Sequence, residues 1–335
     1  MAERFGARAS TAGLIVGAGL ASGLICWLAY RLPPPSTSDF EQIWVAGRAW
    51  LDGQDPYSVV PTTGTRYPLL YPFPAVLVGL PLAPLPFPWA RLLWACLSGA
   101  ALAWAAARRG GGLAIALLSA SFLNAIVQGQ WSPLLTAAAV VPALSWVLSA
   151  KPTIGAAIIL AFPSRRTIAL AAGIFLLSLV LFPRWPWRWI DGLGAATHMV
   201  PLVLRPGGVL LLLALVRWRR PEARLLAALA CVPQTLGLYE TLPLFLVTRT
   251  RPQAYTLAVL SYVAAFAQAA AVPRSEGMPL DALFAARWPF VLVCLYLPAL
   301  TMVLLPIRRY GAGYPGSRTG DASVTPGPRP AAQRM

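Results

Sequence analysis

Apolar runs of about 20 residues recur along the whole 335-residue chain and limit what it can fold into. A run of that length crosses the hydrocarbon core of a bilayer as a helix. Hydrophobic residues make up 58% of the chain and charged residues 11%, against about 25% charged in a typical soluble domain. We therefore expect an all-α polytopic membrane protein.

Arginines form small groups at alternate ends of these runs. The groups are Arg108-Arg109, Arg165-Arg166, Arg217 with Arg219 and Arg220, Arg249 with Arg251, and Arg308-Arg309. Cytoplasmic loops collect positive charge. The pattern therefore predicts about ten transmembrane helices with both termini in the cytoplasm.

The formal net charge of +16 has the same origin. A nucleic-acid-binding protein would carry its arginines as a continuous patch interleaved with aromatic residues. Here they mark helix ends, so we expect contact with membrane lipids and no nucleic-acid partner.

Cysteine and histidine give no sign of a metal or a disulfide framework. Cys26, Cys96, Cys231 and Cys294 lie inside apolar runs without C-x-x-C spacing, and His198 is the single histidine. We expect no metal site and no cofactor.

Residues 32–68 form the predicted first outer loop, directly after the apolar run 11–30, and they are rich in acids. Asp39, Glu41, Asp52 and Asp55 lie here, in a chain with only 11 acidic residues. Ionisable groups near lipid are costly, so this cluster is a hypothesis for a functional site. The alternative is a solvated acidic loop.

The loop is expected to carry a short amphipathic helix on the outer surface. Between Phe40 and Leu51, apolar residues including Trp44 and Trp50 approximate one helical face. Asp52 with Gly53 ends this helix, and Asp55 begins a turn with Pro56.

Later segments are predicted to be irregular. Residues 67–88 are rich in proline and favour a broken segment, while residues 133–163 favour two short helices joined near Lys151. Residues 223–247 are predicted to form a hairpin with Tyr239-Glu240 at its outer bend. Residues 1–310 form one predicted transmembrane domain, and residues 311–335 form a predicted disordered cytoplasmic tail.

Several motifs resemble those of glycosyltransferase family 87. They are DF at 39–40, AGRAWLDGQDPY at 46–57, YPLLYPFP at 67–74, PLAPLP at 81–86, ARLLW at 90–94, GQW at 129–131, KP at 151–152 and WPWRW at 185–189. The resemblance covers roughly the first two-thirds of the chain. Trp131-Ser132 departs from it, since the family has an asparagine after Gly-Gln.

The resemblance implies a GT-C-like fold and transfer of a sugar, mannose or a similar one, from a polyprenyl-phosphate donor. Asp39 matches the family's aspartate, which implies that it removes the proton of the acceptor hydroxyl. The alternative for Asp39 is a cap on the helix that begins at Phe40. Glu41 is the second catalytic candidate and points to another side of the same turn.

The substrate-binding candidates come from the motifs and from location. Lys151, the only lysine, needs a partner, which is a lipid phosphate or an acid such as Glu240, unless it snorkels to an interface. Arg184 and Arg188 lie on the predicted outer side and suit a phosphate or an aromatic anchor.

The remaining candidates come from the motifs and from their location. Gln130 and Trp131 either hold sugar or plug the bundle. Tyr71 is a candidate from its motif, and His198 and Glu240 are candidates from location.

Three functions remain open. The first is a glycosyltransferase in the inner (plasma) membrane, with its active site on the extracytoplasmic face and a lipid-linked or envelope glycan as acceptor. The second is a transporter or flippase of lipid-linked sugars, which would place ionisable groups near the bilayer midplane. The third is a non-catalytic scaffold for envelope assembly, for which Asp39 would be dispensable.

Overall fold

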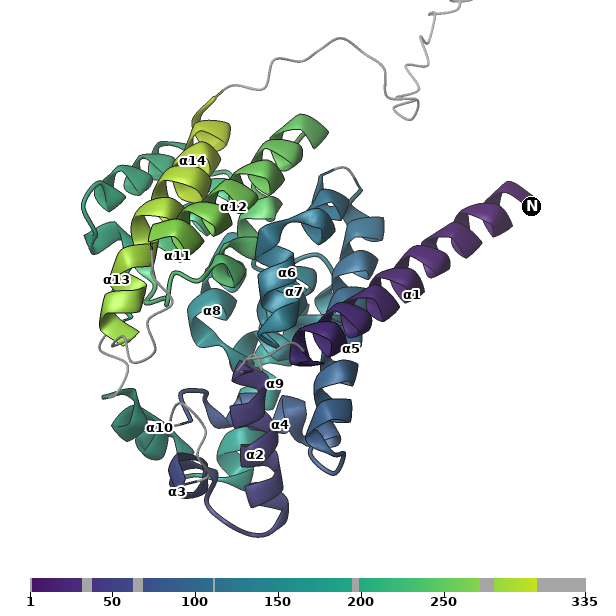
Figure 1. The fold of residues 1–335 in the computed structure, drawn as a ribbon, viewed down its shortest axis with the longest axis vertical. Coiled ribbons are helices and arrows are strands. Elements are labelled where there is room, and N and C mark those ends of the chain that lie inside the picture. The colour runs from purple at the N-terminus through teal and green to yellow at the C-terminus, as the bar shows by residue number, and fades with distance from the viewer. Residues whose placement is uncertain are drawn as a thin grey trace, which may run out of the picture. The chain divides into compact units, whose positions relative to one another are not determined.

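The computed structural model describes residues 2–31, 38–62, 69–110, 112–194, 199–271 and 280–305, and these contain helices and no strand (Figure 1). Residues 1–304 form one compact unit. Residues 305–335 form a second unit, of which only Leu305 is described. The predicted disordered tail, 311–335, lies outside the described residues.

Four of the described helices are long and apolar enough to cross a membrane. They are Ser10–Arg31 within α1 (Ala2–Arg31), α5 (Phe87–Arg109), α12 (Arg251–Ala271), and Ala286–Leu304 within the continuous stretch α13 (Leu280–Val291), η8 (Leu292–Tyr296) and α14 (Leu297–Leu304). A fifth crossing is possible if α9 (Arg165–Leu181) and α10 (Trp185–Leu193), bent by 101°, count as one broken span. These helices fit a multi-pass membrane protein.

The other apolar runs are divided into short α- and 3-10-helices. They are α4 (Phe73–Gly79), η2 (Leu80–Leu82), η3 (Leu113–Leu118), α6 (Ala120–Val127), α7 (Ser132–Ala138), η4 (Pro142–Ala150), α8 (Pro152–Ala161), η5 (Leu202–Leu204), η6 (Gly208–Arg217), α11 (Pro221–Cys231) and η7 (Leu238–Leu246). Proline stands at the start of several, where its missing N–H costs nothing. The predicted break within 67–88 and the predicted junction at Lys151 are confirmed, with one further break before Pro142.

Helices α1 and α5 pack closely because small residues line their contact. A Cβ atom added at Gly99 would overlap the hydroxyl of Ser22, and one at Gly23 would overlap the Cys96 thiol. Small residues of this kind let membrane helices approach each other. Tyr30 meets Phe87 at the far end, so the two helices are antiparallel.

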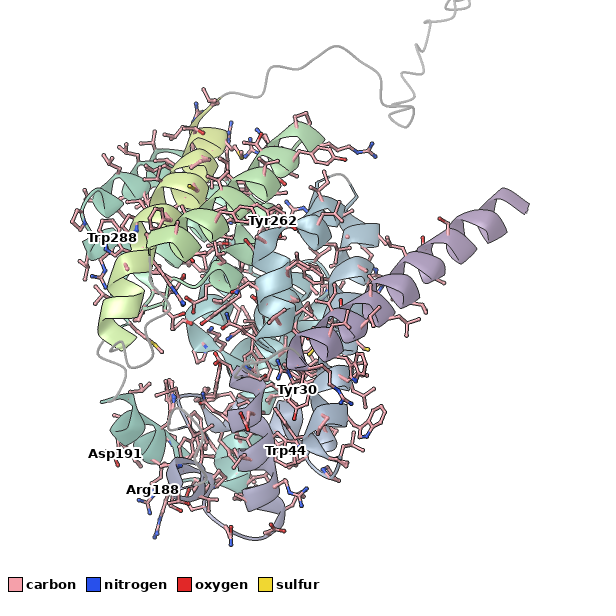
Figure 2. All side chains as sticks on the ribbon, in the orientation of Figure 1. Tyr30, Trp44, Arg188, Asp191, Tyr262 and Trp288 are labelled. Atoms are coloured by element: carbon pink, nitrogen blue, oxygen red, sulfur yellow. The ribbon has the colours of Figure 1, made fainter. Side chains whose placement is uncertain are left out.

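Helices α2 (Asp39–Leu51), α3 (Pro56–Val59), α4 and α10 gather at the lower end of Figure 1, where Figure 2 labels Trp44, Arg188 and Asp191. The predicted amphipathic helix is confirmed as α2. Its buried stripe contains Phe40, Ile43, Ala46 and Ala49, whereas Leu51 is exposed. The predicted apolar face was therefore wrong at Leu51, because the buried stripe does not include this last residue of α2.

Arginines from several of these groups lie at the other end of the unit, and Arg308-Arg309 lie outside the described residues. Arg109 donates to the carbonyl of Leu246 (2.6 Å), and Arg224 donates to that of Ala161 (2.9 Å). Arg220 donates to Val303 (3.3 Å), and Arg249 pairs with Glu222 (3.1 Å). Helix C-termini leave carbonyls without partners, and these guanidinium groups satisfy some of them.

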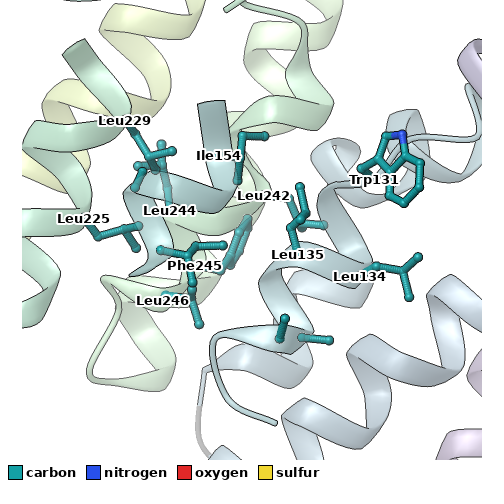
Figure 3. Packing of buried hydrophobic residues seen from close by; sticks show 14 of the residues in the cluster. Trp131, Leu134, Leu135, Ile154, Leu225, Leu229, Leu242, Leu244, Phe245 and Leu246 are labelled. Carbon is teal, nitrogen blue, oxygen red and sulfur yellow. The ribbon is translucent and has the colours of Figure 1, made fainter. Parts of the chain in front are cut away.

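The core lies between these two ends. Figure 3 shows Leu135 of α7, Ile154 of α8 and Phe245 of η7 packed together with side chains of α11. By contrast, large apolar side chains on α1, α9 and α12, such as Leu20, Val180 and Phe266, are exposed. An exposed apolar surface on long helices is what a lipid-facing protein presents.

Candidate functional site

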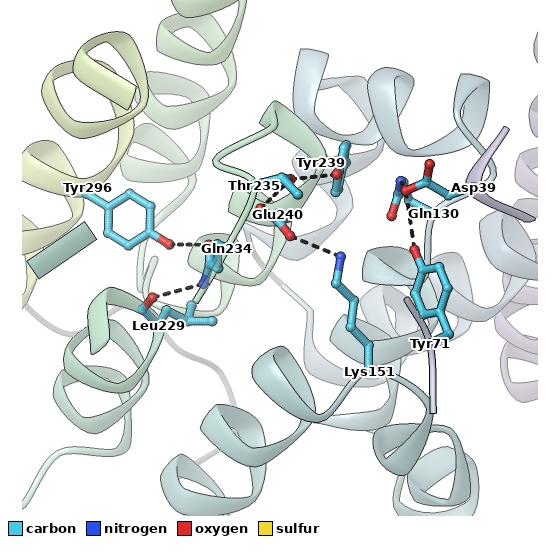
Figure 4. Close-up of polar contacts among 10 residues, drawn as sticks. All are labelled: Asp39, Tyr71, Gln130, Lys151, Leu229, Gln234, Thr235, Tyr239, Glu240 and Tyr296. Atoms are coloured by element: carbon cyan, nitrogen blue, oxygen red, sulfur yellow. Dashed lines mark hydrogen bonds and ion pairs between the residues drawn. The ribbon is translucent and has the colours of Figure 1, made fainter. Parts of the chain in front are cut away.

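Asp39 is the first residue of α2, and its carboxylate is held by side chains from distant parts of the chain. Its Oδ2 accepts hydrogen bonds from Gln130 Nε2 and from the hydroxyl of Tyr71, the latter at 3.3 Å (Figure 4). No hydrogen bond reaches Oδ1 in the part of the chain that the structure describes. The helix-capping interpretation is wrong, because Ser38 is the N-cap residue and neither side chain caps α2.

The turn that carries Gln130 is fixed by its glycine. Gly129 has a φ of +63°, and a Cβ there would lie 2.5 Å from Ser38 Oγ and 2.9 Å from the Cβ of Phe40. Glycine adopts this backbone without cost and leaves room for the start of α2. The N–H of Asp39 donates to the carbonyl of Gln128 (2.9 Å), which locks the two segments together.

Trp131 is fully buried between aromatic rings. Its ring is T-shaped to Trp94, at 4.7 Å between centroids, and lies 6.1 Å from that of Tyr71. This position fits the interpretation of Trp131 as a plug of the bundle, with no face left open for sugar stacking.

Lys151 and Glu240 form an ion pair in the interior. The distance from Nζ to Oε1 is 3.0 Å, and the side chains are only 13% and 2% exposed. The ammonium also lies over the ring of Tyr239, 5.0 Å from its centroid. The expected partner of Lys151 was a lipid phosphate or an acid such as Glu240, and the structure shows the pair with Glu240.

Thr235 completes this group and was not predicted from the sequence. Its hydroxyl donates to Glu240 Oε2 (2.9 Å) and is 2.7 Å from the hydroxyl of Tyr239. A threonine five residues from an acid gives no sequence signal. The turn that follows α11 brings the Thr235 hydroxyl to Glu240, and this contact is apparent only in the folded structure.

That turn is strained. Leu236 is the single non-glycine residue with positive φ in the described ranges, at 54°, and it is buried. Gln234 donates to the carbonyl of Leu229 (2.9 Å) and accepts from Tyr296 (3.2 Å) in the π-helical segment η8. Strained residues and π-helical segments are both frequent at functional sites. Residues 234–240 are thus held in place from several sides.

The two groups face each other across one interior region. Figure 4 shows Lys151 between Glu240 and Tyr71, with Asp39 and Gln130 beyond. Burial raises the pKa of the Asp39 carboxyl, while the hydrogen bond from Gln130 and then the charge of Lys151 oppose that rise. A carboxylate with a raised pKa that still has one unbonded oxygen is suited to accept a proton.

Glu41 does not take part in this arrangement. It is partly buried, which raises the pKa of its carboxyl, and the charge of Arg91 opposes the rise. Its carboxylate forms no hydrogen bond with the Asp39 group. As a second catalytic candidate it therefore has no supporting contact.

Of the predicted phosphate-binding arginines, Arg188 lies on α10 and Arg184 is the N-cap residue of that helix, away from these contacts. Arg184 is exposed, and Arg188 pairs with Asp55 (Nε to Oδ2, 3.2 Å). Asp55 also caps α3 by accepting from the N–H of Tyr57 (2.9 Å), which confirms its predicted role in a turn. His198 lies outside the described residues.

Within the described ranges, no three or more His, Cys, Asp or Glu side chains lie together as a metal site would need. No family model, no curated protein and no solved structure matches this chain.

Proposed function

We propose that this protein is an integral-membrane inverting glycosyltransferase that uses a polyprenyl-phosphate sugar as donor, with mannose or a similar sugar. The observation that carries the proposal is the convergence of motif residues that are far apart in sequence. Tyr71 and Gln130 both donate hydrogen bonds to Asp39, and Lys151 lies beside them. These are residues of the DF, YPLLYPFP, GQW and KP motifs that resemble glycosyltransferase family 87.

In the proposed reaction, Asp39 acts through Oδ1, to which no described residue donates a hydrogen bond. The acceptor hydroxyl gives its proton to this oxygen while the hydroxyl oxygen attacks the anomeric carbon of the donor sugar. The bond from that carbon to the phosphate oxygen breaks, and the lipid phosphate leaves with the electron pair. Gln130 and Tyr71 keep the other carboxylate oxygen in place, so the base is oriented before substrate arrives.

Lys151 has a defined role in this proposal. With both acids ionised, Asp39 and Glu240 carry two negative charges against one positive charge on Lys151. A departing phosphate near this group would compete with Glu240 for the ammonium. Lys151 is thus better suited to balance the charge of Asp39 than to hold a phosphate alone.

The proposal includes a membrane topology. The protein would be a GT-C-like bundle of about ten crossings in the inner membrane, with both termini in the cytoplasm and the Asp39 group on the extracytoplasmic face. The common arginine end supports it, because positive charge collects on the cytoplasmic side. The acceptor is then a lipid-linked or envelope glycan.

The test is transfer by the purified chain in liposomes with a panel of synthetic polyprenyl-phosphate sugars and membrane lipid extract as acceptor. At least one radiolabelled donor sugar is expected to move to an extractable glycolipid or glycan. If no donor supports transfer, while the protein is folded and inserted, the proposal fails.

A transporter or flippase of lipid-linked sugars is the second candidate, favoured by the depth of the Lys151–Glu240 pair. Helix α8 has ten residues, so Lys151 lies about 15 Å from the arginine-bonded carbonyl of Ala161, roughly half of the hydrocarbon thickness. Transporters place ionisable groups at this depth. Movement of a fluorescent lipid-linked sugar between leaflets, without sugar transfer, would favour this candidate.

A further inference from the structure

A pocket of about 180 Å³ lies between α3 and α10, outside the contacts of the Asp39 group. Its walls are formed by Tyr57, Ser58, Pro61, Leu69, Arg188 and Asp191. Pockets for drug-sized ligands measure about 300–1,000 Å³. This one has room for a single small ring.

The charges around the pocket are mixed. Arg188 is paired with Asp55, and Asp191 adds a second carboxylate to the wall. A phosphate would therefore meet two negative groups and one cation that is already paired. A hydroxyl group, which both donates and accepts, can use the carboxylate of Asp191 as acceptor and the remaining N–H groups of Arg188 as donors.

The pocket shares a wall with the Asp39 group. The hydroxyl of Tyr57 donates to the carbonyl of Tyr71 (3.1 Å), and the hydroxyl of Tyr71 donates to Asp39. Trp189 of α10 donates to the carbonyl of Leu70 (3.0 Å) on the same stretch. A ligand chain with one ring in the pocket would thus place its next ring close to residues 69–71.

Helix α10 is built to lie in a membrane interface. It turns by 101° from α9, buries Trp185 and exposes Trp187 and Ile190. An amphipathic helix with exposed tryptophan suits the level of the lipid head groups. The pocket beside α10 would then be reached from the water at the membrane surface.

We propose that this pocket binds one ring of a neutral sugar chain, as a subsite for the glycan acceptor. The assignment as an acceptor subsite rests on the proposed transferase function, but the binding of a neutral sugar does not require catalysis. The mixed charges, the size of the pocket and the wall shared with residues 69–71 support it together.

Binding is tested by fluorescence anisotropy on the full chain in detergent, with fluorescein-labelled trisaccharides of mannose, glucose and arabinose. The variant Ser58→Trp fills the pocket, and Asp191→Leu removes its carboxylate. Gln54→Trp is the matched control, since Gln54 is exposed in the turn before α3 and does not line the pocket.

At least one trisaccharide is expected to bind, about tenfold or more weaker to Ser58→Trp and Asp191→Leu and within about twofold of wild type to Gln54→Trp. Asp39→Asn should bind it as wild type does, so a failure of transfer and a failure of this subsite give different results. The subsite is wrong if no trisaccharide binds, if Ser58→Trp binds normally, or if geranyl phosphate displaces the bound trisaccharide from the pocket.

Discussion

The two polar ends of the unit use their charges differently. At the arginine end, guanidinium groups of Arg109, Arg220 and Arg224 donate to carbonyls at or near the ends of other helices. At the Asp39 end, charged groups bond mainly to other side chains, in the interior. Charges that finish helices tolerate solvent, whereas buried charges need specified partners.

This difference predicts where substitutions are costly. Removing one charge at the Asp39 end leaves another charge buried without its partner, which is the expensive outcome. Removing one at the arginine end leaves a neutral carbonyl without its donor, which costs less than an unpaired buried charge.

Lys151→Ala should give the largest loss of stability, because it leaves Glu240 as an unpaired buried charge. The expected loss is about 3–5 kcal/mol, measured by urea unfolding in detergent. The double variant Lys151→Met with Glu240→Gln should recover most of it. If the double variant is no more stable than Lys151→Ala, the pair is not what holds this region.

Gly129→Ala should cost about 1–3 kcal/mol and reduce any transfer activity, since a Cβ there meets Ser38 and Phe40 at a positive φ. The matched control is Gly53→Ala, at φ +73° with no atom near its added Cβ. The control should lose about 1 kcal/mol and keep its activity. Equal losses in both variants would mean that the approach of α2 to the turn at Gly129 does not matter.

The pH dependence of stability should report the partly buried carboxyl of Asp39. Because its pKa is raised in the folded state, the folded protein binds this proton more tightly than the unfolded chain does. The associated stability is present in full below the unfolded pKa of about 3.9 and is lost as the pH rises through the folded pKa. Between pH 4 and 7, the midpoint temperature of thermal unfolding should therefore fall more steeply with rising pH in wild type than in Asp39→Asn. Parallel curves would contradict it.

Arg249→Gln should have the smallest effect. Its ion pair with Glu222 lies at the arginine end, where each side chain is 16% exposed, whereas Glu240 is only 2% exposed. The partner left behind is less buried, so the loss should be smaller than that of Lys151→Ala. Urea unfolding in detergent measures the loss, with Lys151→Ala in the same series. A loss as large as that of Lys151→Ala would erase the contrast between the two ends.

The sequence predicted the elements whose signals are local. Helix α2 follows from its apolar spacing, the junction at Lys151 from Pro152, and the grouping of arginines from their position at helix ends. Asp39 and Gln130 were candidates because their motifs resemble a family.

The number of crossings and the partners within the site are not local properties. Within residues 133–163, the sequence indicated the junction between η4 and α8 at Lys151 but not the further break between α7 and η4. Lys151 and Glu240 are 89 positions apart, and Glu240 was only one possible partner. Thr235 carried no signal at all, and Trp131 could be assigned to packing only from its neighbours.

If Asp39 is the proton acceptor, replacing it with asparagine removes the base and little else. Both donors bond to one carboxylate oxygen, so the carbonyl oxygen of asparagine can keep both hydrogen bonds. The variant should remain folded and inserted, with a thermal midpoint near that of wild type at neutral pH or above it.

The measurement is the rate of sugar transfer by Asp39→Asn in liposomes, with Glu41→Gln as the control. A positioned general base contributes about 10²–10⁴-fold to the rate, so Asp39→Asn should lose at least about 100-fold while Glu41→Gln keeps most activity. Transfer by Asp39→Asn at a near wild-type rate would contradict the account.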